Sequence, residues 1–422
     1  NLEAAVVKFR AKAGVAVVVE PFTGEILALA NYPFFDPNNF SRQSSRRWRN
    51  RAIADLYEPG STFKAILAAA ALEEGVVGKE DLFYCELGKY SLGGKDIHDS
   101  KKHGWLPFYK IIQYSSNIGT TKVAEKLKKK RYFKYIKNFG FGSPTGIDLP
   151  GEAKGLVRLP VRWSRLDLAA HSFGQAIAVT PIQMAMAYAA IANGGFLMRP
   201  FVVRRIVDSK GDVLFLNSPN VVRRVISTPT ARKMNSILRG VVREGGTGFR
   251  ADVEGFDVAG KTGTSQKADL VNGGYSKKER LASFIGFVPA DDPRLVVLVL
   301  IDEPEVNVYG GVVAAPVFRD IAQGTLRHLG VVPESSGIDW LPAVEKNPSL
   351  REEGGDRGRG GDLPKTSGAP DFFGLSLREA VLKARALDLH VVIRGSGYVV
   401  KQSPSPGANW GEGGTLSLIL RS

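Results

Sequence analysis

The chain has 422 residues, of which 44% are hydrophobic and 23% are charged, and its formal net charge is +15. These values are ordinary for a globular protein with one large domain and a small one, or with two to three average domains. The single cysteine, Cys85, excludes an internal disulfide and a cysteine metal cluster, and the five histidines show no ligand spacing. We therefore expect no metal and no cofactor.

The excess of positive charge favours an anionic environment, such as a membrane surface or an acidic polymer. Basic residues gather at 46–51 and 126–131, and we interpret both clusters as solvated faces. No base-reading motif accompanies them, so no nucleic-acid partner is predicted. No apolar run reaches the roughly 20 residues that span a bilayer. Because the chain begins at Asn1 inside an expected helix, residues 2–12, we expect a membrane anchor to precede it in the intact protein.

The first predicted elements are two apolar strands, residues 15–20 and 26–30, joined by a turn that contains Gly24. This pattern is typical of a β-hairpin. Residues 31–51 are polar and basic without a clear period, so we expect a loop there.

A serine and a lysine then stand at the start of an alanine-rich helix. The segment Glu58-Pro-Gly-Ser-Thr-Phe-Lys64 precedes a helix-forming run that extends to about residue 74. Its Pro-Gly pair places Ser61 at the first helical turn, and Lys64 lies one turn further along the same face. The amine thus faces the hydroxyl, and a serine needs such a base to act as a nucleophile. Taken alone, the pattern also fits a surface helix.

A second polar segment lies between two predicted helices. Residues 76–105 are glycine-rich and are expected to be irregular, while helices are predicted at 106–114 and 119–130. Ser115 and Asn117 fall in the short loop between the helices, where side chains can face a cleft.

The middle of the chain alternates between loops, helices and short strands. We predict a loop at 138–160, a helix at 180–192, two short strands within 200–216 and a helix at 228–244. Thr228 is the expected N-cap of the last helix, with Pro229 at its first position.

Three strands follow and complete the predicted sheet. They cover residues 256–264, 282–288 and 294–302, and a helix at 314–329 closes the segment. Strands at both ends of the segment with helices between them predict an α/β (α+β) fold, in which helices cover a five-stranded antiparallel sheet. The sheet would pair the first hairpin with these last three strands.

The composition changes after residue 330. Residues 331–369 are rich in proline, glycine and charge, which predicts a flexible linker. Residues 370–422 again carry a short helix and three strands. We therefore divide the chain into a domain at 1–330, a linker at 331–369 and a small domain at 370–422.

Three short motifs now stand in order: Ser61-x-x-Lys64, Ser115-x-Asn117 and Lys261-Thr-Gly263. This ordered set is typical of penicillin-binding proteins and class A β-lactamases, and it is far more specific than any one member. A second Ser-x-Asn, Ser218-Pro-Asn220, carries a proline in an expected hairpin turn and does not fit.

The resemblance extends over about residues 13–330 and is closest to class B penicillin-binding proteins. It is carried by Thr23-Gly-Glu-Ile-Leu-Ala28, Asn50-Arg-Ala52, Tyr57-Glu-Pro-Gly-Ser-Thr-Phe-Lys64, Ser116-Asn-Ile-Gly119, Gly174-Gln175, Thr180-Pro-Ile-Gln183 and Val258-Ala-Gly-Lys-Thr-Gly-Thr264. The Ser-Ser-Asn of the second motif resembles the septal, cell-division branch, whereas the elongation branch more often has Ser-Ser-Asp. Ala176 stands where the family often has glycine.

The C-terminal segment resembles a PASTA module. The likeness rests on Pro370-Asp-Phe-Phe-Gly374 and on Gln402-Ser-Pro-Ser-Pro-Gly407. PASTA modules are linked to binding of cell-wall peptide and β-lactams, so either ligand binding or a packing role is open for this single copy.

The resemblance implies acyl transfer through a serine. Ser61 would attack the carbonyl between the last two D-alanines of a peptidoglycan stem peptide, and a neutral Lys64 would take its proton. Burial and the charge of Lys261 are expected to lower the pKa of Lys64. Ser115 would relay a proton to the leaving D-alanine, and Asn117 would hold Lys64 and the substrate amide.

The third motif would bind the substrate's C-terminal carboxylate. Lys261 would raise the local potential, and the hydroxyls of Thr262 and Thr264 would bind the carboxylate. Gly263 would let the strand approach the acyl group closely. The backbone N–H groups of Ser61 and Thr264 would form an oxyanion hole.

The same resemblance implies partners and a location. We expect stem peptides and β-lactam antibiotics as ligands, septal synthesis proteins such as a glycosyltransferase as partners, and a site on the outer side of the cytoplasmic membrane. Class A β-lactamases carry Glu-x-x-Leu-Asn, which is absent between Asn117 and Lys261. A D,D-carboxypeptidase and a β-lactam sensor or scaffold without turnover remain alternatives.

Overall fold

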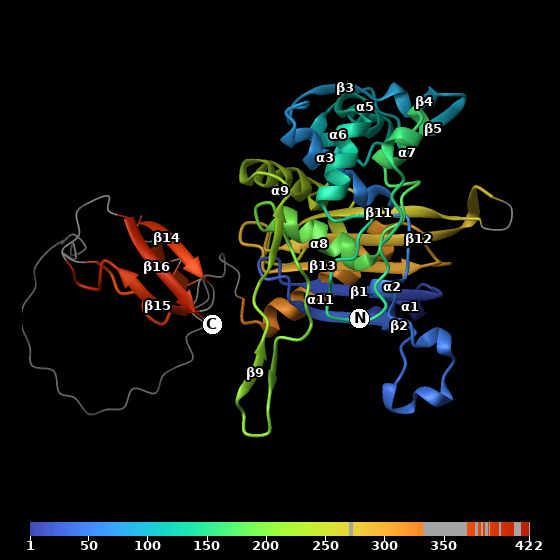
Figure 1. Ribbon diagram of the computed structural model, residues 1–422. Helices are drawn as coiled ribbons and strands as arrows, with labels where there is room; N and C mark the ends of the chain where they lie inside the picture. The colour runs from blue at the N-terminus through green and yellow to red at the C-terminus, as the bar shows by residue number, and fades with distance from the viewer. Residues whose placement is uncertain are drawn as a thin grey trace, which may run out of the picture. The chain divides into compact units, whose positions relative to one another are not determined.

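The computed structural model describes residues 1–269, 273–331, 369–375, 379–380, 383–384, 387, 389–395, 398–408 and 415–421 (Figure 1). The chain divides into two compact units, Asn1–Ser336 and Gly337–Ser422. All but the two end residues of the expected linker, 331–369, lie outside the described residues. In the described part of the chain, no helix has the length and apolar character needed to cross a membrane.

A five-stranded antiparallel sheet forms the centre of the first unit, as predicted. Its strands are β1 (Ala13–Val19), β2 (Ile26–Tyr32), β11 (Ala259–Ala268), β12 (Tyr275–Val288) and β13 (Leu295–Asp302), in the order β11-β12-β13-β1-β2. Strands β1 and β13 are apolar along almost their whole length because both of their faces are covered. The N-terminal hairpin is thereby joined to strands from the far end of the unit.

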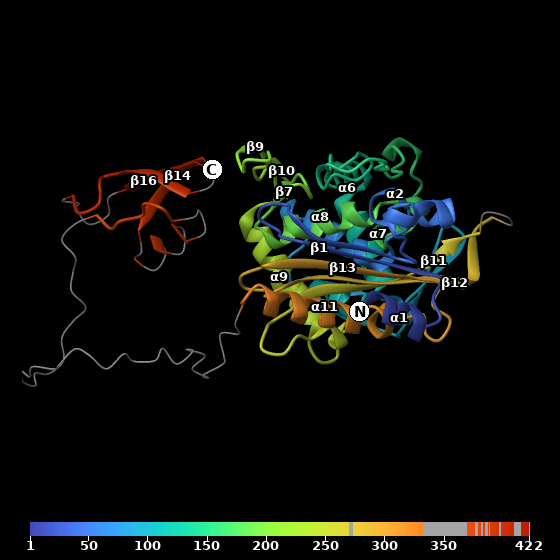
Figure 2. The same ribbon diagram turned by 90° about the horizontal axis from the view of Figure 1, so that it is seen from below.

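Helices cover the two faces of this sheet (Figure 2). Alternate residues of β1 enter different cores: Val15, Val17 and Val19 pack on one face, while Ala16 and Val18 pack on the other. The first face carries α2 (Arg51–Ala54), α3 (Lys64–Glu73), α8 (Pro181–Ala192) and α9 (Thr228–Val242). The second carries α1 (Leu2–Lys8), α10 (Gly310–Val313) and α11 (Ala315–His328).

A helical subdomain lies beyond the β11 edge of the sheet (Figure 1). It contains α4 (Phe108–Gln113), α5 (Asn117–Leu127), α6 (Lys129–Asn138) and α7 (Arg165–Ser172). Helix α3 connects it to the sheet, because α3 packs against α5 and α6 as well as α9. The cleft-facing motifs can therefore come from the subdomain on one side and from β11 on the other.

Several short elements differ from the expectations. The segment expected to be irregular, with the first two residues of the predicted helix at 106–114, holds four strands in two antiparallel pairs, β3 with β6 and β4 with β5: β3 (Leu82–Tyr84), β4 (Lys89–Leu92), β5 (Lys95–His98) and β6 (Trp105–Pro107). The expected loop at 31–51 contains the 3-10 helices η1 (Pro37–Arg42) and η2 (Ser45–Arg47). Helices α2, α6 and α7 were not predicted. Apart from α6, which has ten residues, these elements have three to eight residues, too few for a periodic pattern to stand out.

Helix α9 begins as expected but has a different cap. The Ser227 hydroxyl accepts a hydrogen bond from the N–H of Thr230, so Ser227 and not Thr228 is the N-cap, and Pro229 occupies the second helical position. The Glu73 carboxylate accepts bonds from the N–H and hydroxyl of Ser227 at 3.0 and 2.8 Å, which fixes this choice. A tertiary contact thus decides between two adjacent capping residues.

Two further pairs of strands lie between α8 and α9. Strands β7 (Phe196–Met198) and β10 (Val221–Arg224) pair with each other, and so do β8 (Arg205–Val207) and β9 (Val213–Leu216). The second pair is the hairpin predicted within 200–216. It projects from the body of the unit in Figure 1.

The second unit contains a three-stranded sheet in the order β14-β16-β15. Strand β16 (Thr415–Arg421) pairs in parallel with β14 (His390–Gly395) and antiparallel with β15 (Tyr398–Ser403). Its core contains Phe372. The buried Gln402 accepts a bond from the N–H of Phe372 and donates to two carbonyl groups. The three strands match the expectation, whereas much of the expected helix at 376–387 lies outside the described residues.

Candidate active site

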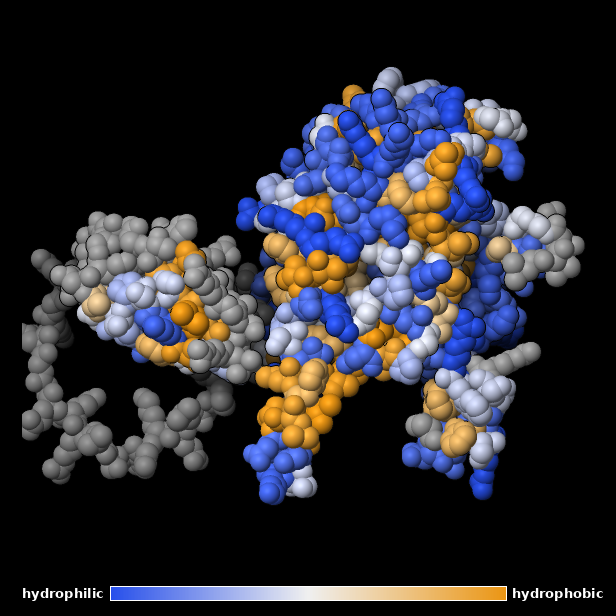
Figure 3. All heavy atoms as spheres, viewed as in Figure 1, coloured by the Kyte–Doolittle hydropathy of each residue, from blue (hydrophilic) through white to orange (hydrophobic). Residues whose placement is uncertain are grey.

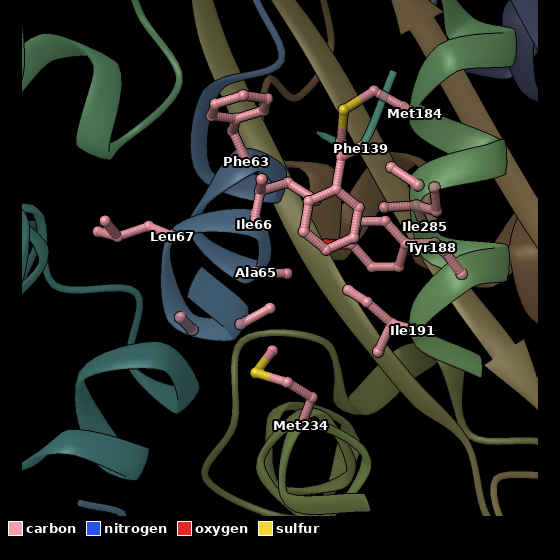
Figure 4. Close-up of a cluster of buried hydrophobic side chains, with 14 of the residues drawn as sticks. Phe63, Ala65, Ile66, Leu67, Phe139, Met184, Tyr188, Ile191, Met234 and Ile285 are labelled. Atoms are coloured by element: carbon pink, nitrogen blue, oxygen red, sulfur yellow. The ribbon is translucent and has the colours of Figure 1, made fainter. Parts of the chain in front are cut away.

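The candidate nucleophile Ser61 lies in a 3-10 helix, η3 (Gly60–Phe63), that runs directly into α3 at Lys64. Ser61 is half-buried, whereas its neighbours Thr62 and Phe63 are fully covered. Figure 4 shows Phe63 and the first residues of α3 within the cluster that Tyr188 and Ile285 help to form. The core therefore holds the segment that presents the serine.

Polar contacts hold the same segment. The Thr62 hydroxyl donates to the carbonyl of Pro59 at 2.7 Å, and the Tyr188 hydroxyl donates to the carbonyl of Thr62 at 2.8 Å. The N–H of Gly60 donates to the carbonyl of Gly174 at 3.0 Å. Buried polar groups with satisfied partners keep the backbone in one position.

Lys64 is fully buried and connects the first motif to the second. Its Nζ donates to the carbonyl oxygen of Ser115 at 2.6 Å, to the Ser115 hydroxyl at 3.2 Å and to Asn117 Oδ1 at 2.7 Å. Burial lowers the pKa of the Lys64 amine to about 7, and the negative charge of Asp99 opposes this shift. A base with such a pKa is suited to proton transfer near neutral pH.

The second motif has an unusual backbone conformation. Ser115 has φ 61°, a left-handed conformation that costs a non-glycine residue free energy. This conformation directs both the carbonyl and the hydroxyl of Ser115 to Lys64. Ser116 caps α5, since its hydroxyl accepts from the N–H of Gly119, and Asn117 is the first residue of the helix.

Asp99 holds this motif in place and was not found from the sequence. Its carboxylate accepts bonds from the N–H groups of Asn117 and Ile118 at 2.6 and 3.0 Å and from the Ser116 hydroxyl. A carboxylate at the N-terminus of a helix also interacts favourably with the helix dipole. The carbonyl of His98 accepts from Asn117 Nδ2 at 2.9 Å. No spacing rule links residue 99 to residue 117.

The third motif lies on β11, the edge strand, which packs against η3. Lys261 is fully buried, and its Nζ donates to the carbonyl of Thr262 at 3.3 Å. The hydroxyls of Thr262 and Thr247 lie 2.8 Å apart, and the Thr264 hydroxyl accepts from the N–H of Gly310 at 3.0 Å.

Burial lowers the pKa of both buried lysines. Burial, and then the positive charge of Lys64, hold the pKa of Lys261 well below its usual value. Burial lowers the pKa of Lys64, and the charge of Asp99 opposes this shift. The expected lowering of the Lys64 pKa by burial is therefore present, and the repulsion between the two lysines is seen in the lowered pKa of Lys261.

Gly263 permits a close approach of β11 to the nucleophile segment. A Cβ at this position would lie 2.3 Å from Ser283 Oγ and 3.0 Å from Thr62 Cγ2. Both distances are too short for a larger residue without movement of β11 relative to Ser283 on β12 and to Thr62 on η3. Gly263 therefore allows close packing of β11 against Thr62 and Ser283, whereas the expected approach of the strand to an acyl group stays a prediction.

Glu58 is a second residue that sequence reasoning missed. Its Oε1 accepts from the N–H of Ala176 at 3.0 Å and from the Tyr275 hydroxyl at 3.2 Å. Burial raises the pKa of the Glu58 carboxyl, and these two hydrogen bonds and Arg158 oppose the shift. Glu58 thus joins the nucleophile segment to the turn at residue 176 and to the start of β12.

The structure brings the first and second motifs into direct contact and places the third on the strand beside them. Among the described residues, no group of three or more His, Cys, Asp or Glu side chains could hold a metal ion. A serine at the start of a buried helix, with a buried lysine one helical turn further on and a lysine-bearing edge strand beside it, is the arrangement of the Ser-x-x-Lys class of active-site-serine proteins.

Comparison with known proteins identifies the family within this class. The family model for the penicillin binding protein transpeptidase domain matches residues 14–323, and the PASTA domain model matches residues 369–422. The chain therefore belongs to the penicillin-binding protein transpeptidase family and carries a PASTA domain at its C-terminal end. The resemblance to class B penicillin-binding proteins is confirmed.

Relatives and solved structures agree with this assignment. The chain is 38% identical to Stage V sporulation protein D of Bacillus subtilis, over 100% of this chain and 62% of that protein. It is 39% identical to the probable peptidoglycan D,D-transpeptidase PenA of Neisseria flavescens, over 79% of this chain and 80% of that protein. Penicillin-binding protein 3 of Mycobacterium tuberculosis, in complex with aztreonam, has a TM-score of 0.73 at 34% identity, covering 79% of this chain and 77% of that chain.

The contacts of Asp99 generate a prediction about the second motif. The replacement Asp99→Asn keeps the shape of the side chain. It removes the negative charge of the carboxylate that accepts hydrogen bonds from the N–H groups at the start of α5. Because Ser116 and Asn117 then lose their support, we expect covalent labelling by a fluorescent penicillin to slow by about tenfold, equivalent to about 1.4 kcal/mol.

Asp96→Asn is the matched control, because Asp96 is three residues away and forms an exposed ion pair with Lys89. It should label at the wild-type rate. Equal labelling rates for Asp99→Asn and Asp96→Asn would contradict the role given to Asp99.

Proposed function

We propose that this protein is a serine D,D-transpeptidase that cross-links peptidoglycan stem peptides and that β-lactams acylate. The observation that carries the proposal is the buried amine of Lys64, a residue one helical turn after Ser61. This amine contacts Ser115 and Asn117. Family membership and the chemistry of the three motifs support it.

In the first half-reaction, Ser61 Oγ attacks the carbonyl carbon between the last two D-alanines of the donor peptide. Neutral Lys64 accepts the hydroxyl proton, and the bond between that carbon and the nitrogen of the terminal D-alanine breaks. Ser115 lies within hydrogen-bond distance of Lys64 Nζ and passes the proton to the leaving amine. The products are an acyl-serine ester and free D-alanine.

In the second half-reaction, the amine of a neighbouring stem peptide attacks the ester carbon. The new amide cross-links two peptides, and Ser61 regains its proton through Lys64. The backbone N–H groups of Ser61 and Thr264 would stabilise the oxyanion in both steps, each by about 3 kcal/mol. Lys261, Thr262 and Thr264 would bind the donor's C-terminal carboxylate from β11.

We place this activity in septal wall synthesis, on the outer side of the cytoplasmic membrane and beside division proteins such as a glycosyltransferase. The Ser-Ser-Asn form of the second motif supports the septal assignment. An anchor that precedes residue 1 would hold the protein there. The division into domains at 1–330 and 370–422, with a linker at 331–369, is likewise proposed from composition. Depletion of the protein in cells should give filaments with blocked septa, and normal division would contradict the septal assignment.

One prediction of this mechanism concerns the covalent adduct. Incubation with benzylpenicillin should add one drug mass to the intact chain, and peptide mapping should find it on Ser61. The Glu-x-x-Leu-Asn motif, whose carboxylate activates the deacylating water in class A β-lactamases, is absent between Asn117 and Lys261. The adduct should therefore last much longer than one catalytic cycle of a β-lactamase. Ser61→Ala should abolish it, and an adduct elsewhere or rapid release of hydrolysed drug would refute the proposal.

A stem pentapeptide then separates the rival activities. With an acceptor amine present, a transpeptidase yields the amide product, whereas a carboxypeptidase yields only the shortened peptide and D-alanine. A sensor forms the penicillin adduct but releases no D-alanine.

A further prediction concerns the pH dependence of acylation. Only the neutral form of Lys64 accepts a proton, and an amine with a pKa of about 7 is about one tenth neutral at pH 6 and about nine tenths neutral at pH 8. The second-order rate constant for penicillin acylation should therefore rise about tenfold between these pH values. A flat or falling profile would contradict the assignment of Lys64 as the base, and Lys64→Arg, which stays charged, should acylate poorly at both pH values.

A further inference from the structure

The hairpin of β8 and β9 exposes apolar side chains along its whole stem. Its large apolar residues are between 38% and 68% exposed: Val202, Val203, Ile206, Val207, Val213, Leu214, Phe215 and Leu216. Figure 3 shows them as an orange projection with a blue tip. A contiguous exposed surface of this kind on a soluble domain marks an interaction site.

The base of the hairpin is fixed, so the projection has a defined direction. The N–H groups of Val202 and Val203 donate to the Asp148 carboxylate at 2.7 and 2.8 Å. Across the stem, the N–H of Asn217 donates to the carbonyl of Arg204 at 2.8 Å. The Asp148 contacts join the hairpin to the loop around residue 148, and the Asn217–Arg204 contact holds its two sides together.

The backbone edges of the hairpin are open to a third strand. Among the described residues, β8 and β9 pair only with each other, in the register Arg205↔Leu216 and Ile206↔Phe215. A two-stranded ribbon is marginally stable by itself, and apolar side chains on both of its faces need cover. A strand added to an open edge supplies backbone hydrogen bonds together with that cover.

The charge around the stem defines the partner. Residues 199–224 contain six basic residues and two acidic ones. Arg204 and Arg205 line a shallow groove together with Val202, Val203 and Leu216. Within the described part of the chain, neither guanidinium forms an ion pair. One of the two acidic residues, Asp208, accepts the N–H groups of Lys210 and Asp212 in the tip turn.

We propose that this hairpin binds an extended, acidic segment of a partner protein, which adds as a third strand and places alternate apolar side chains on the stem. A second copy of the chain would bring the same arginines together, and like charges oppose that contact. A lipid bilayer would meet the charged tip, Asp208 to Asp212, before the apolar stem. An acidic strand would pair with the open backbone edge, cover the apolar stem and form ion pairs with the arginines.

The proposal is tested with random 12-residue peptides displayed on phage and selected on the full chain. Enriched peptides should alternate apolar residues and carry Asp or Glu. A synthetic copy should slow amide hydrogen exchange at residues 213–216. Phe215→Asp should weaken its binding at least tenfold, since it places a charge on the apolar stem.

Charge reversal sharpens the test. Arg205→Glu should weaken an acidic peptide at least tenfold, and replacement of the peptide's acid by Lys should restore binding to this variant. Val161→Asp, an exposed valine on a different element, should bind like the wild type. All variants should retain penicillin labelling, because the hairpin is remote from Ser61, and this shows that they are folded.

Three results would overturn the proposal. One is a selection that yields no acidic, alternating peptides, or peptides that Phe215→Asp does not affect. Another is binding of phosphatidylglycerol vesicles that Phe215→Asp abolishes, which would assign the stem to a lipid surface. The third is a concentration-dependent dimer in sedimentation equilibrium that the same variant dissociates, which would assign it to a second copy.

Discussion

The fold places one amine, Lys64 Nζ, where water cannot reach it. A buried ammonium needs hydrogen-bond acceptors, and this one finds two carbonyl-type oxygens and a hydroxyl, all from residues 115 and 117. These acceptors exist only because Ser115 takes a left-handed conformation and Asp99 holds the start of α5. The sheet, α3 and the helical subdomain must therefore be assembled together before the site can hold Lys64, the proposed base.

The second buried lysine gives this arrangement a further property. Lys261 and Lys64 are both fully buried, and each disfavours a proton on the other. In the proposed mechanism, a substrate carboxylate at β11 would stabilise the charged form of Lys261. Lys64 would then be more easily held neutral, the form that accepts a proton from Ser61. Donor binding and activation of the nucleophile would thus be coupled through charge.

The sequence predicted those parts of the site that local rules determine. Ser61 and Lys64 share a helical turn, and Lys261 follows an apolar strand pattern, so spacing alone places them on their elements. It did not find Asp99 or Glu58, because their partners lie 18 and 118 residues away along the chain. The choice of Ser227 over Thr228 as the cap of α9 depends in the same way on Glu73. The five-stranded sheet was predictable because its apolar strands are long, whereas strands of three or four residues around residue 90 show no period.

The fit between the sheet edge and the nucleophile segment depends on residues without functional groups. A Cβ at Gly263 would strike Ser283 and Thr62, and a Cβ at Gly174 would lie 2.1 Å from the carbonyl oxygen of Gly60. Gly174 also has φ 78°, so a larger residue would be strained there whatever the space. Gly263 and Gly174, which are far apart in the sequence, thus both pack closely against η3. The position of Ser61 relative to Lys261 is therefore set by backbone packing, and a methyl group at either glycine would move the proposed nucleophile away from the strand that is proposed to bind the carboxylate.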